Sequence, residues 1–119
     1  MPTVLIVEDD DEVRPMLEVI LAVQGTRRWR AANGQEALDQ LAGRRPSLIL
    51  LDIEMPVMDG YEFRAIQLQD RRLADIPVIC LSAGERTDAI ERQTGVPCLS
   101  KPATVAALLA AVRNVCGSP

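Results

Sequence analysis

Short apolar runs recur along the chain, and each of them ends at a polar side chain. Residues 3–7, 48–51 and 77–81 read Thr-Val-Leu-Ile-Val, Leu-Ile-Leu-Leu and Pro-Val-Ile-Cys-Leu, without the polar alternation of a half-exposed strand. Continuous runs of this length are typical of strands buried on both faces of a parallel sheet. A weaker run at residues 97–100 predicts a further strand near the end of the chain.

The segments between these runs carry apolar residues at helical spacing. Residues 13–23 contain an apolar stripe that Met16, Val19 and Val23 broaden, and a glycine at position 25 ends the pattern. Shorter patterns predict four more helices, over residues 34–43, 60–69, 85–95 and from Thr104 onwards. In the helix over residues 60–69, Phe63 and Ile66 are expected to face the core.

One predicted strand is unusually charged. Residues 27–31 read Arg-Arg-Trp-Arg-Ala. Either the arginines bind phosphate groups, or they protect the edge of a sheet against pairing with another chain, and we favour the second interpretation.

Five strands that alternate with five helices predict a single α/β domain over residues 1–119. Its parallel sheet is expected to be doubly wound as a (βα)5 unit, with helices on both faces and right-handed crossovers. We adopt the strand order 2-1-3-4-5 of flavodoxin-like folds, because periodicity alone does not determine it. In this order the first, third, fourth and fifth strands are neighbours.

Composition and charge exclude several function classes. The 119 residues include no histidine, so histidine-based catalysis, imidazole metal sites and a role as a histidine phosphodonor are excluded. A net charge of −4 argues against nucleic-acid binding, which depends on clustered positive charge. No apolar run is long enough to cross a membrane and no signal-peptide pattern is present, so we expect a cytoplasmic protein. The widely spaced Cys80, Cys98 and Cys116 predict buried, reduced thiols rather than a zinc site.

Polar side chains that follow the predicted strands carry the candidate chemistry. Glu8 and Asp9 follow the first strand, Asp52 the third, Ser82 the fourth and Lys101 the fifth. In the adopted order they converge on one crevice. Three adjacent carboxylates repel one another, and Mg²⁺ accepts oxygen ligands from carboxylates, phosphate and water. An ionised Asp52 can therefore attack a phosphoryl group, with Lys101 stabilising its charge and Ser82 offering a hydroxyl.

Asp52 on its own could equally be the polar residue that ends a strand. The sequence after it supports a functional loop, because Met55-Pro56 forces an extended bend. Asp59 and Gly60 then predict a helix cap and a permissive backbone position.

Four motifs give the chain a resemblance to a known family. They are Val-Leu-Ile-Val-Glu-Asp-Asp at residues 4–10, Asp-Ile-Glu-Met-Pro-Val-Met-Asp-Gly at 52–60, Leu-Ser-Ala at 81–83 and Lys-Pro at 101–102. Each motif alone is weak. Because all four occur in order and each follows a predicted strand, the chain resembles a CheY-like receiver domain of a two-component response regulator over essentially its whole length.

The resemblance implies a role for each acidic residue. Asp52 is the expected phosphoacceptor, which receives its phosphoryl group from a histidine kinase or a histidine phosphotransfer protein. Asp9, assisted by Glu8, matches the acidic pair that holds Mg²⁺ together with Asp52, and Glu54 matches the position that supplies a backbone carbonyl ligand.

The resemblance also implies how a signal leaves the domain. Ser82 matches the switch hydroxyl that moves toward the phosphate, and Lys101 matches the phosphate-binding lysine. The expected output is a change in binding to a downstream protein, or to a C-terminal effector domain if the chain is part of a longer protein. No catalysis is expected beyond Mg²⁺-dependent self-phosphorylation and slow autodephosphorylation, and the domain is expected to be a monomer or a weak homodimer.

Two features depart from the family pattern. Cys98 stands where a switch aromatic is expected, three residues before Lys101, and Ala103 replaces the usual aromatic after Lys-Pro. The interval between Ser82 and Lys101 is about one helical turn shorter than is usual for the family. We therefore expect the signal to leave through the backbone after Ser82 and the shortened fourth helix, rather than through residue 98.

Two other functions stay open. A pseudo-receiver would dock to a partner without ever taking phosphate, although the complete set of acids, hydroxyl and lysine argues against it. Asp52 and Glu54 also loosely resemble the Asp-x-Asp motif of haloacid-dehalogenase phosphatases. Those enzymes need a second acid two residues on and usually a cap over the substrate, and 119 residues leave little room for a cap.

Overall fold

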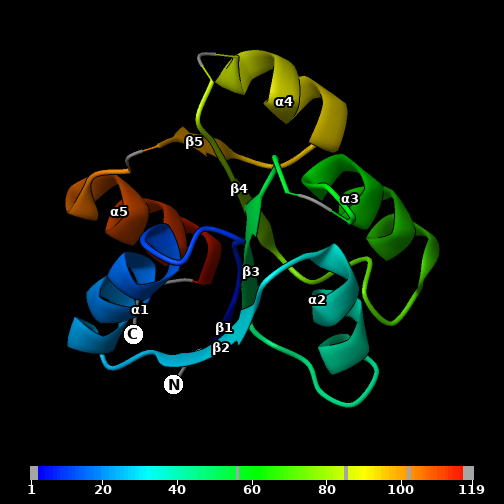
Figure 1. Ribbon diagram of the computed structural model, residues 1–119, viewed down its shortest axis with the longest axis horizontal. Coiled ribbons are helices and arrows are strands. Elements are labelled where there is room, and N and C mark those ends of the chain that lie inside the picture. The colour runs from blue at the N-terminus through cyan, green and yellow to red at the C-terminus, as the bar shows by residue number, and fades with distance from the viewer. Residues whose placement is uncertain (1–2, 56, 85, 102, 117–119) are drawn as a thin grey trace.

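Strands and helices alternate along the chain (Figure 1). The computed structural model describes residues 3–55, 57–84, 86–101 and 103–116. Its elements are β1 (Thr3–Val7), α1 (Val13–Val23), β2 (Arg27–Ala31), α2 (Gly34–Leu41), β3 (Leu48–Asp52), α3 (Gly60–Gln69), β4 (Val78–Ser82), α4 (Thr87–Thr94), β5 (Cys98–Ser100) and α5 (Val105–Cys116). The expected start of the fourth helix at Glu85 lies outside the described residues.

All strand pairs are parallel, in the order β2-β1-β3-β4-β5, which confirms the predicted topology. Val7 pairs with Leu51, Leu51 with Cys80, and Cys80 with Cys98, so the carboxyl ends of four strands are level with one another. The arginine-rich β2 lies at one edge of the sheet, as predicted.

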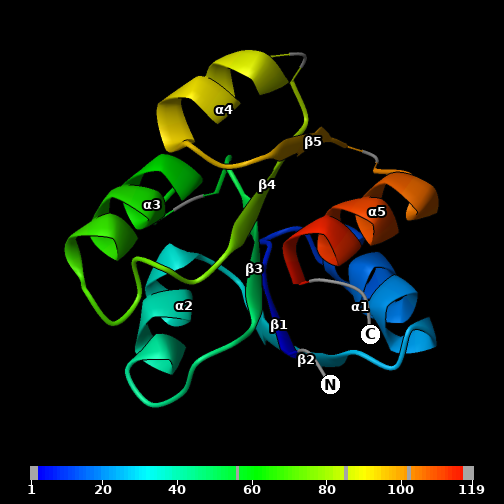
Figure 2. The same cartoon turned by 180° about the vertical axis from the view of Figure 1, so that it is seen from behind.

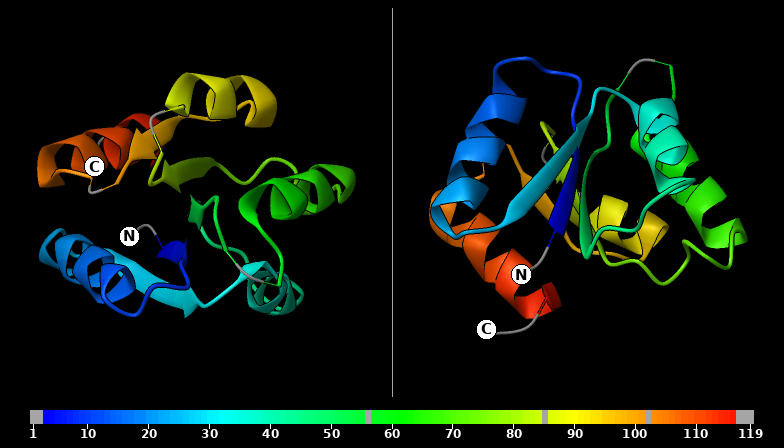
Figure 3. Two further views of the ribbon diagram at one scale, coloured as in Figure 1. Left: turned by 45° about the horizontal axis from the view of Figure 1, so that its top comes forward. Right: turned by 90° about the horizontal axis from the view of Figure 1, so that it is seen from below.

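Helices cover both faces of the sheet. Figures 1 and 2 show α1 and α5 on one side and α2 and α3 on the other, and both views of Figure 3 keep the same separation. Alternate strand residues supply the two cores, because successive side chains of a strand point to opposite faces. One core joins the sheet to α1 and α5 through Leu17, Leu21 and Leu108, and the other joins it to α2, α3 and α4 through Leu41, Phe63 and Ile90.

The buried stripe of α1 is narrower than predicted. Leu17 and Leu21 are buried, whereas Met16, Val19 and Val23 are 59%, 64% and 78% exposed. Val13 and Ile20 also pack against this core and are partly buried, whereas the residues that broaden the stripe are exposed.

The prediction that Phe63 and Ile66 of α3 face the core is correct for Phe63. It is wrong for Ile66, which is 40% exposed. Gln67 is buried instead and donates hydrogen bonds from Nε2 to the carbonyl oxygens of Leu73 and Ile76, at 2.9 and 3.1 Å. The side chain of Arg64 donates to Gln67 Oε1 at 2.8 Å. A fully bonded amide thus takes a core position that an apolar pattern does not predict, and it secures the loop before β4.

Side-chain caps begin several helices. Asp10 Oδ1 accepts hydrogen bonds from the backbone nitrogens of Glu12 and Val13, at 2.8 and 3.3 Å, and these bonds lower the pKa of Asp10. Asp10 belongs to an acidic run at residues 8–12, and its two bonds cap the start of α1. The other caps are Asn33, Asp59 and Thr104.

Cys80 and Cys98 are buried free thiols, as expected. Burial raises the pKa of Cys80 to about 12 and that of Cys98 to about 11, so both thiols stay protonated at neutral pH. The side chain of Cys116 lies outside the described part of the chain. Among the described residues, no helix combines the length and the apolar character that a membrane span requires.

Candidate functional site

Asp52 is the last residue of β3 and is almost completely buried, with 1% of its surface exposed. The strands β1 and β4 flank β3, so Asp52 lies at the centre of the carboxyl edge of the sheet. The backbone nitrogen of Glu54 donates a hydrogen bond to Asp52 Oδ1 at 3.2 Å, which ties the carboxylate to the loop that follows.

Gly60 is needed in this loop because of a close approach. A Cβ atom at this position would lie 2.7 Å from Ile53 Cα and 2.8 Å from the carbonyl oxygen of Asp52. The sequence suggested a permissive backbone at Gly60, but the described glycines with positive φ are Gly25 and Gly95, at 74° and 76°. Gly60 instead lets the start of α3 pack directly against the strand end that carries Asp52.

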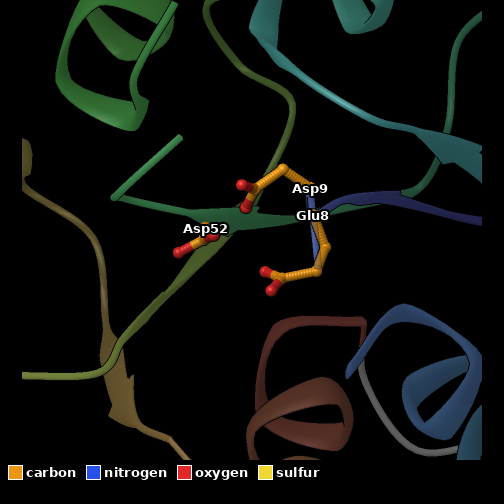
Figure 4. Close-up of side chains that lie close together, drawn as sticks. All are labelled: Glu8, Asp9 and Asp52. Carbon is orange, nitrogen blue, oxygen red and sulfur yellow. The ribbon is translucent and has the colours of Figure 1, made fainter. Parts of the chain in front are cut away.

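Glu8 and Asp9 follow β1 and bring two more carboxylates to Asp52. One carboxylate oxygen from each of the three residues lies within 4.8 Å of the others. Figure 4 shows the three side chains gathered around the ends of β1 and β3. Glu8 is fully buried, and Asp9 is the most accessible of the three.

Lys101 supplies positive charge to this cluster. Its Nζ lies 2.8 Å from Glu8 Oε1 and 3.1 Å from Asp52 Oδ1, and its backbone nitrogen donates to the carbonyl oxygen of Ser82 at 2.8 Å. Burial by itself lowers the pKa of Lys101, but its bonds to Glu8 and Asp52 outweigh burial, so the net pKa is raised.

The pKa of Asp52 is raised to about 7, first because the carboxyl group is buried and second because Glu8 is close. Lys101 works in the opposite direction but does not cancel these effects. Asp52 is therefore only partly ionised near neutral pH unless a further positive charge lies beside it.

The acidic cluster fits a hard divalent cation such as Mg²⁺. Glu8 Oε2 is buried and has no hydrogen-bond partner among the described residues, although Oε1 of the same group bonds to Lys101. A buried carboxylate oxygen without a partner is costly, and a cation that takes oxygen ligands would satisfy it. Lys101 provides one positive charge for three carboxylates, so charge balance also favours a cation.

Ser82 ends β4, beside the cluster, but its hydroxyl contacts a different residue. Ser82 Oγ donates a hydrogen bond to Glu54 Oε1 at 3.1 Å and accepts one from the backbone nitrogen of Gly84 at 3.2 Å. The sequence pointed only to the backbone of Glu54, and this contact of its side chain was missed. The sequence did contain a signal for this contact. Asp52 pairs with Leu81 on the neighbouring strand, so an acid two residues after Asp52 comes near the hydroxyl that follows Leu81.

Comparison of the chain with known proteins agrees with this arrangement of side chains. Residues 4–113 match the model of the response regulator receiver domain family. The chain belongs to this family. It is 41% identical over 96 residues to the transcriptional regulatory protein AfsQ1 of Streptomyces coelicolor, a match that covers 81% of this chain and 40% of AfsQ1. The chain spans about half or less of the length of the curated relatives it matches.

Solved structures show the same fold. The chemotaxis protein CheY4 of Vibrio cholerae is 30% identical, with a TM-score of 0.84, and the match covers 97% of this chain and 98% of CheY4. The receiver domain of the sensor histidine kinase PA1611 from Pseudomonas aeruginosa is 28% identical, with a TM-score of 0.89 and 98% of both chains covered. That structure has a magnesium ion coordinated in its active-site cleft.

Proposed function

We propose that this receiver domain accepts a phosphoryl group on Asp52 in a Mg²⁺-dependent reaction. The observation that supports the proposal most strongly is the placement of Asp52 between Lys101 and the acidic pair Glu8 and Asp9. Receiver domains are in general not classical enzymes, and the proposed chemistry is a transfer to the domain itself rather than turnover of a substrate.

In the proposed transfer, a carboxylate oxygen of Asp52 attacks the phosphorus of a phosphohistidine on another protein. The new O–P bond forms as the P–N bond breaks, and the electron pair stays on the imidazole nitrogen. The donor must be a separate protein or domain, because this chain has no histidine. A histidine kinase or a histidine phosphotransfer protein would supply this group.

The residues of the chain have distinct roles in this proposal. Lys101, 3.1 Å from Asp52, stabilises charge on the transferring group. Glu8, Asp9, Asp52 and the backbone carbonyl of Glu54 would hold Mg²⁺. The bound cation supplies positive charge that keeps Asp52 ionised and offsets the charge of the phosphoryl oxygens.

The proposed output is a change in protein binding. AfsQ1 is a transcriptional regulatory protein more than twice as long as the matched region, so an effector domain on the same polypeptide is one proposed target and a separate protein is the other. The domain boundaries at residues 1–119, the monomeric or weakly dimeric state and the cytoplasmic location stay predictions.

Intact-mass measurement after incubation with acetyl phosphate and Mg²⁺ tests the proposal. We expect a gain of about 80 Da, the mass of one phosphoryl group, that requires Mg²⁺ and is absent in Asp52→Asn. A gain that persists in Asp52→Asn would assign the phosphate to another residue. No gain in the wild type, with either acetyl phosphate or a phosphorylated histidine phosphotransfer protein, would identify a pseudo-receiver.

A further inference from the structure

The hydroxyl of Ser82 is already occupied by a neighbouring carboxylate. Ser82 is buried, with 2% of its surface exposed, and its Oγ donates to Glu54 Oε1 at 3.1 Å. The backbone nitrogen of Gly84 donates to the same Oγ at 3.2 Å. A serine hydroxyl has one proton, so it donates to one acceptor at a time.

Glu54 is held in place by the loop that carries Asp52. Its backbone nitrogen donates to Asp52 Oδ1 at 3.2 Å, while its carboxylate reaches the end of β4. Within the described part of the chain, this carboxylate forms no salt bridge, and Ser82 is its hydrogen-bond partner. The side chain of Glu54 therefore connects the loop after β3 to the end of β4.

We propose that Glu54 is a resting-state latch that holds the Ser82 hydroxyl away from Asp52 until phosphorylation releases it. This inference rests on the proposed function, because the competing acceptor is a phosphoryl oxygen on Asp52. It adds a positioning role for the Glu54 side chain, which acts through Ser82, to the ligand role proposed for its backbone.

Two effects of phosphorylation open the latch. The phosphoryl group supplies acceptor oxygens that compete for the single proton of Ser82. It also brings about two negative charges close to Glu54, so like-charge repulsion drives the Glu54 carboxylate toward solvent. The hydrogen bond between Glu54 and Ser82 exists only before phosphorylation. It therefore stabilises the resting arrangement relative to the phosphorylated one.

The latch also reaches the backbone that leads to α4. Gly84 bonds to Ser82 Oγ, and α4 begins at Thr87. When the Ser82 hydroxyl moves, either the hydrogen bond from the Gly84 nitrogen lengthens or Gly84 moves with the hydroxyl. The choice of acceptor for the Ser82 hydroxyl is thus linked to the backbone that leads to α4, through which we expect the signal to leave.

A double-mutant cycle on Glu54 and Ser82 tests the latch, with beryllofluoride and Mg²⁺ as the phosphoryl mimic. We expect Glu54→Ala to tighten beryllofluoride binding by about threefold or more when Ser82 is present, because no latch has to break. Glu54→Gln keeps an acceptor without the charge and should give a smaller gain. In the Ser82→Ala background, Glu54→Ala should tighten binding clearly less, because only the charge repulsion is then relieved. Glu62→Ala, which removes another exposed acid close to the loop, should leave the affinity unchanged.

Charge repulsion alone predicts a different result. If Glu54→Ala tightens binding equally with Ser82 and with Ala at position 82, the carboxylate acts only on the anion and the latch is wrong. Amide exchange of the unphosphorylated protein gives a readout that needs no phosphoryl group. Glu54→Ala should change exchange at Gly84, and unchanged exchange there would overturn the latch even if the wild type proved to be a pseudo-receiver.

Discussion

Lys101 reaches across the end of β4 to Asp52, with 3.1 Å between Nζ and Oδ1. Asp52 ends β3 and Lys101 follows β5, and these two strands are not neighbours in the sheet. The same Nζ lies 2.8 Å from Glu8 Oε1, at the end of β1. One ammonium group thus joins the ends of three elements that are far apart in sequence. Two of its contacts are to buried carboxylates, so the loss of Lys101 would affect stability as well as chemistry.

We expect Lys101→Met to destabilise the fold at neutral pH. Removing one partner of a fully buried ion pair costs about 3–5 kcal/mol, and the 18% exposure of the Lys101 side chain reduces this to roughly 2 kcal/mol. The loss should be larger at pH 8 than at pH 5, because the carboxylates left without Lys101 become neutral as they bind protons. Urea unfolding at both pH values measures the difference. Arg71→Met, in the exposed loop before β4, is the control, and an equal loss in both variants would contradict the assigned role of Lys101.

The raised pKa of Asp52 predicts that the phosphoacceptor destabilises its own fold. A carboxyl group with a pKa of about 7 in the folded state and 3.8 as its ordinary value binds protons more readily when folded. Stability is therefore lost as the pH rises from about 4 to about 7. Asp52→Asn removes this penalty and should stabilise the Mg²⁺-free protein at pH 8 by on the order of 2 kcal/mol.

The gain from Asp52→Asn should shrink as the pH falls toward 4, where Asp52 is protonated in the folded protein. Urea unfolding from pH 4 to pH 8 measures it, with Asp39→Asn on the exposed face of α2 as the control. A variant that is less stable than the wild type at pH 8 would show that Lys101 outweighs burial and the nearby Glu8.

The residues that could be predicted from the sequence are those whose position follows from the backbone. Glu8 and Lys101 follow strands and Asp52 ends one, and the level carboxyl ends of a parallel sheet bring such residues together. The strand order came from fold analogy, since periodicity identifies strands and not their neighbours. The resemblance to receiver domains then assigned the expected roles.

The contacts that could not be predicted are made by side chains across loops. The Ser82 hydroxyl meets Glu54, 28 positions away, because of the path of one loop and the rotamer of one glutamate. Gln67 is buried because two carbonyl oxygens of the following loop need donors, and a hydrophobic pattern assigns that surface to Ile66. Neither contact leaves a periodic signal in the sequence.

Mg²⁺ should stabilise the wild-type protein, because it relieves repulsion within the acidic cluster and satisfies Glu8 Oε2. We expect the melting temperature to rise with Mg²⁺ concentration and the rise to be weaker in Asp9→Ala. Glu12→Ala removes an exposed acid of the same acidic run and should keep the full response. A full response in Asp9→Ala would remove Asp9 from the metal site.

Gly60→Ala should destabilise the protein and slow its phosphorylation. The added Cβ would meet the backbone of Asp52 and Ile53 at 2.7–2.8 Å, and backbone atoms cannot move aside as a flexible side chain can. We expect a loss of about 2 kcal/mol and displacement of the Asp52 loop. Gly43→Ala is the matched control, because nothing lies within 4 Å of its Cβ position, and it should be neutral or slightly stabilising. Equal stability of the two variants would show that α3 moves away from β3 at little cost.

The last prediction concerns Cys98, which stands at the position of the missing switch aromatic. Its backbone nitrogen donates a hydrogen bond at 2.9 Å to Oε2 of Glu91, a residue of α4. The sequence suggested that the signal passes through α4 and leaves residue 98 unaffected. The structure instead links the two, because any shift of α4 moves the acceptor of the Cys98 amide. We therefore expect beryllofluoride with Mg²⁺ to speed amide exchange at Cys98.

Glu91→Ala should make exchange at Cys98 fast with or without beryllofluoride, because the acceptor is gone in both states, and it should leave phosphorylation of Asp52 intact. Arg92→Ala, which changes the next residue of α4, should keep the wild-type exchange pattern. If beryllofluoride alters exchange at the start of α4 but not at Cys98 in the wild type, Glu91 moves with β5 and the signal bypasses residue 98. In that case the Glu91 carboxylate does not take over the role of the missing switch aromatic in connecting α4 to β5.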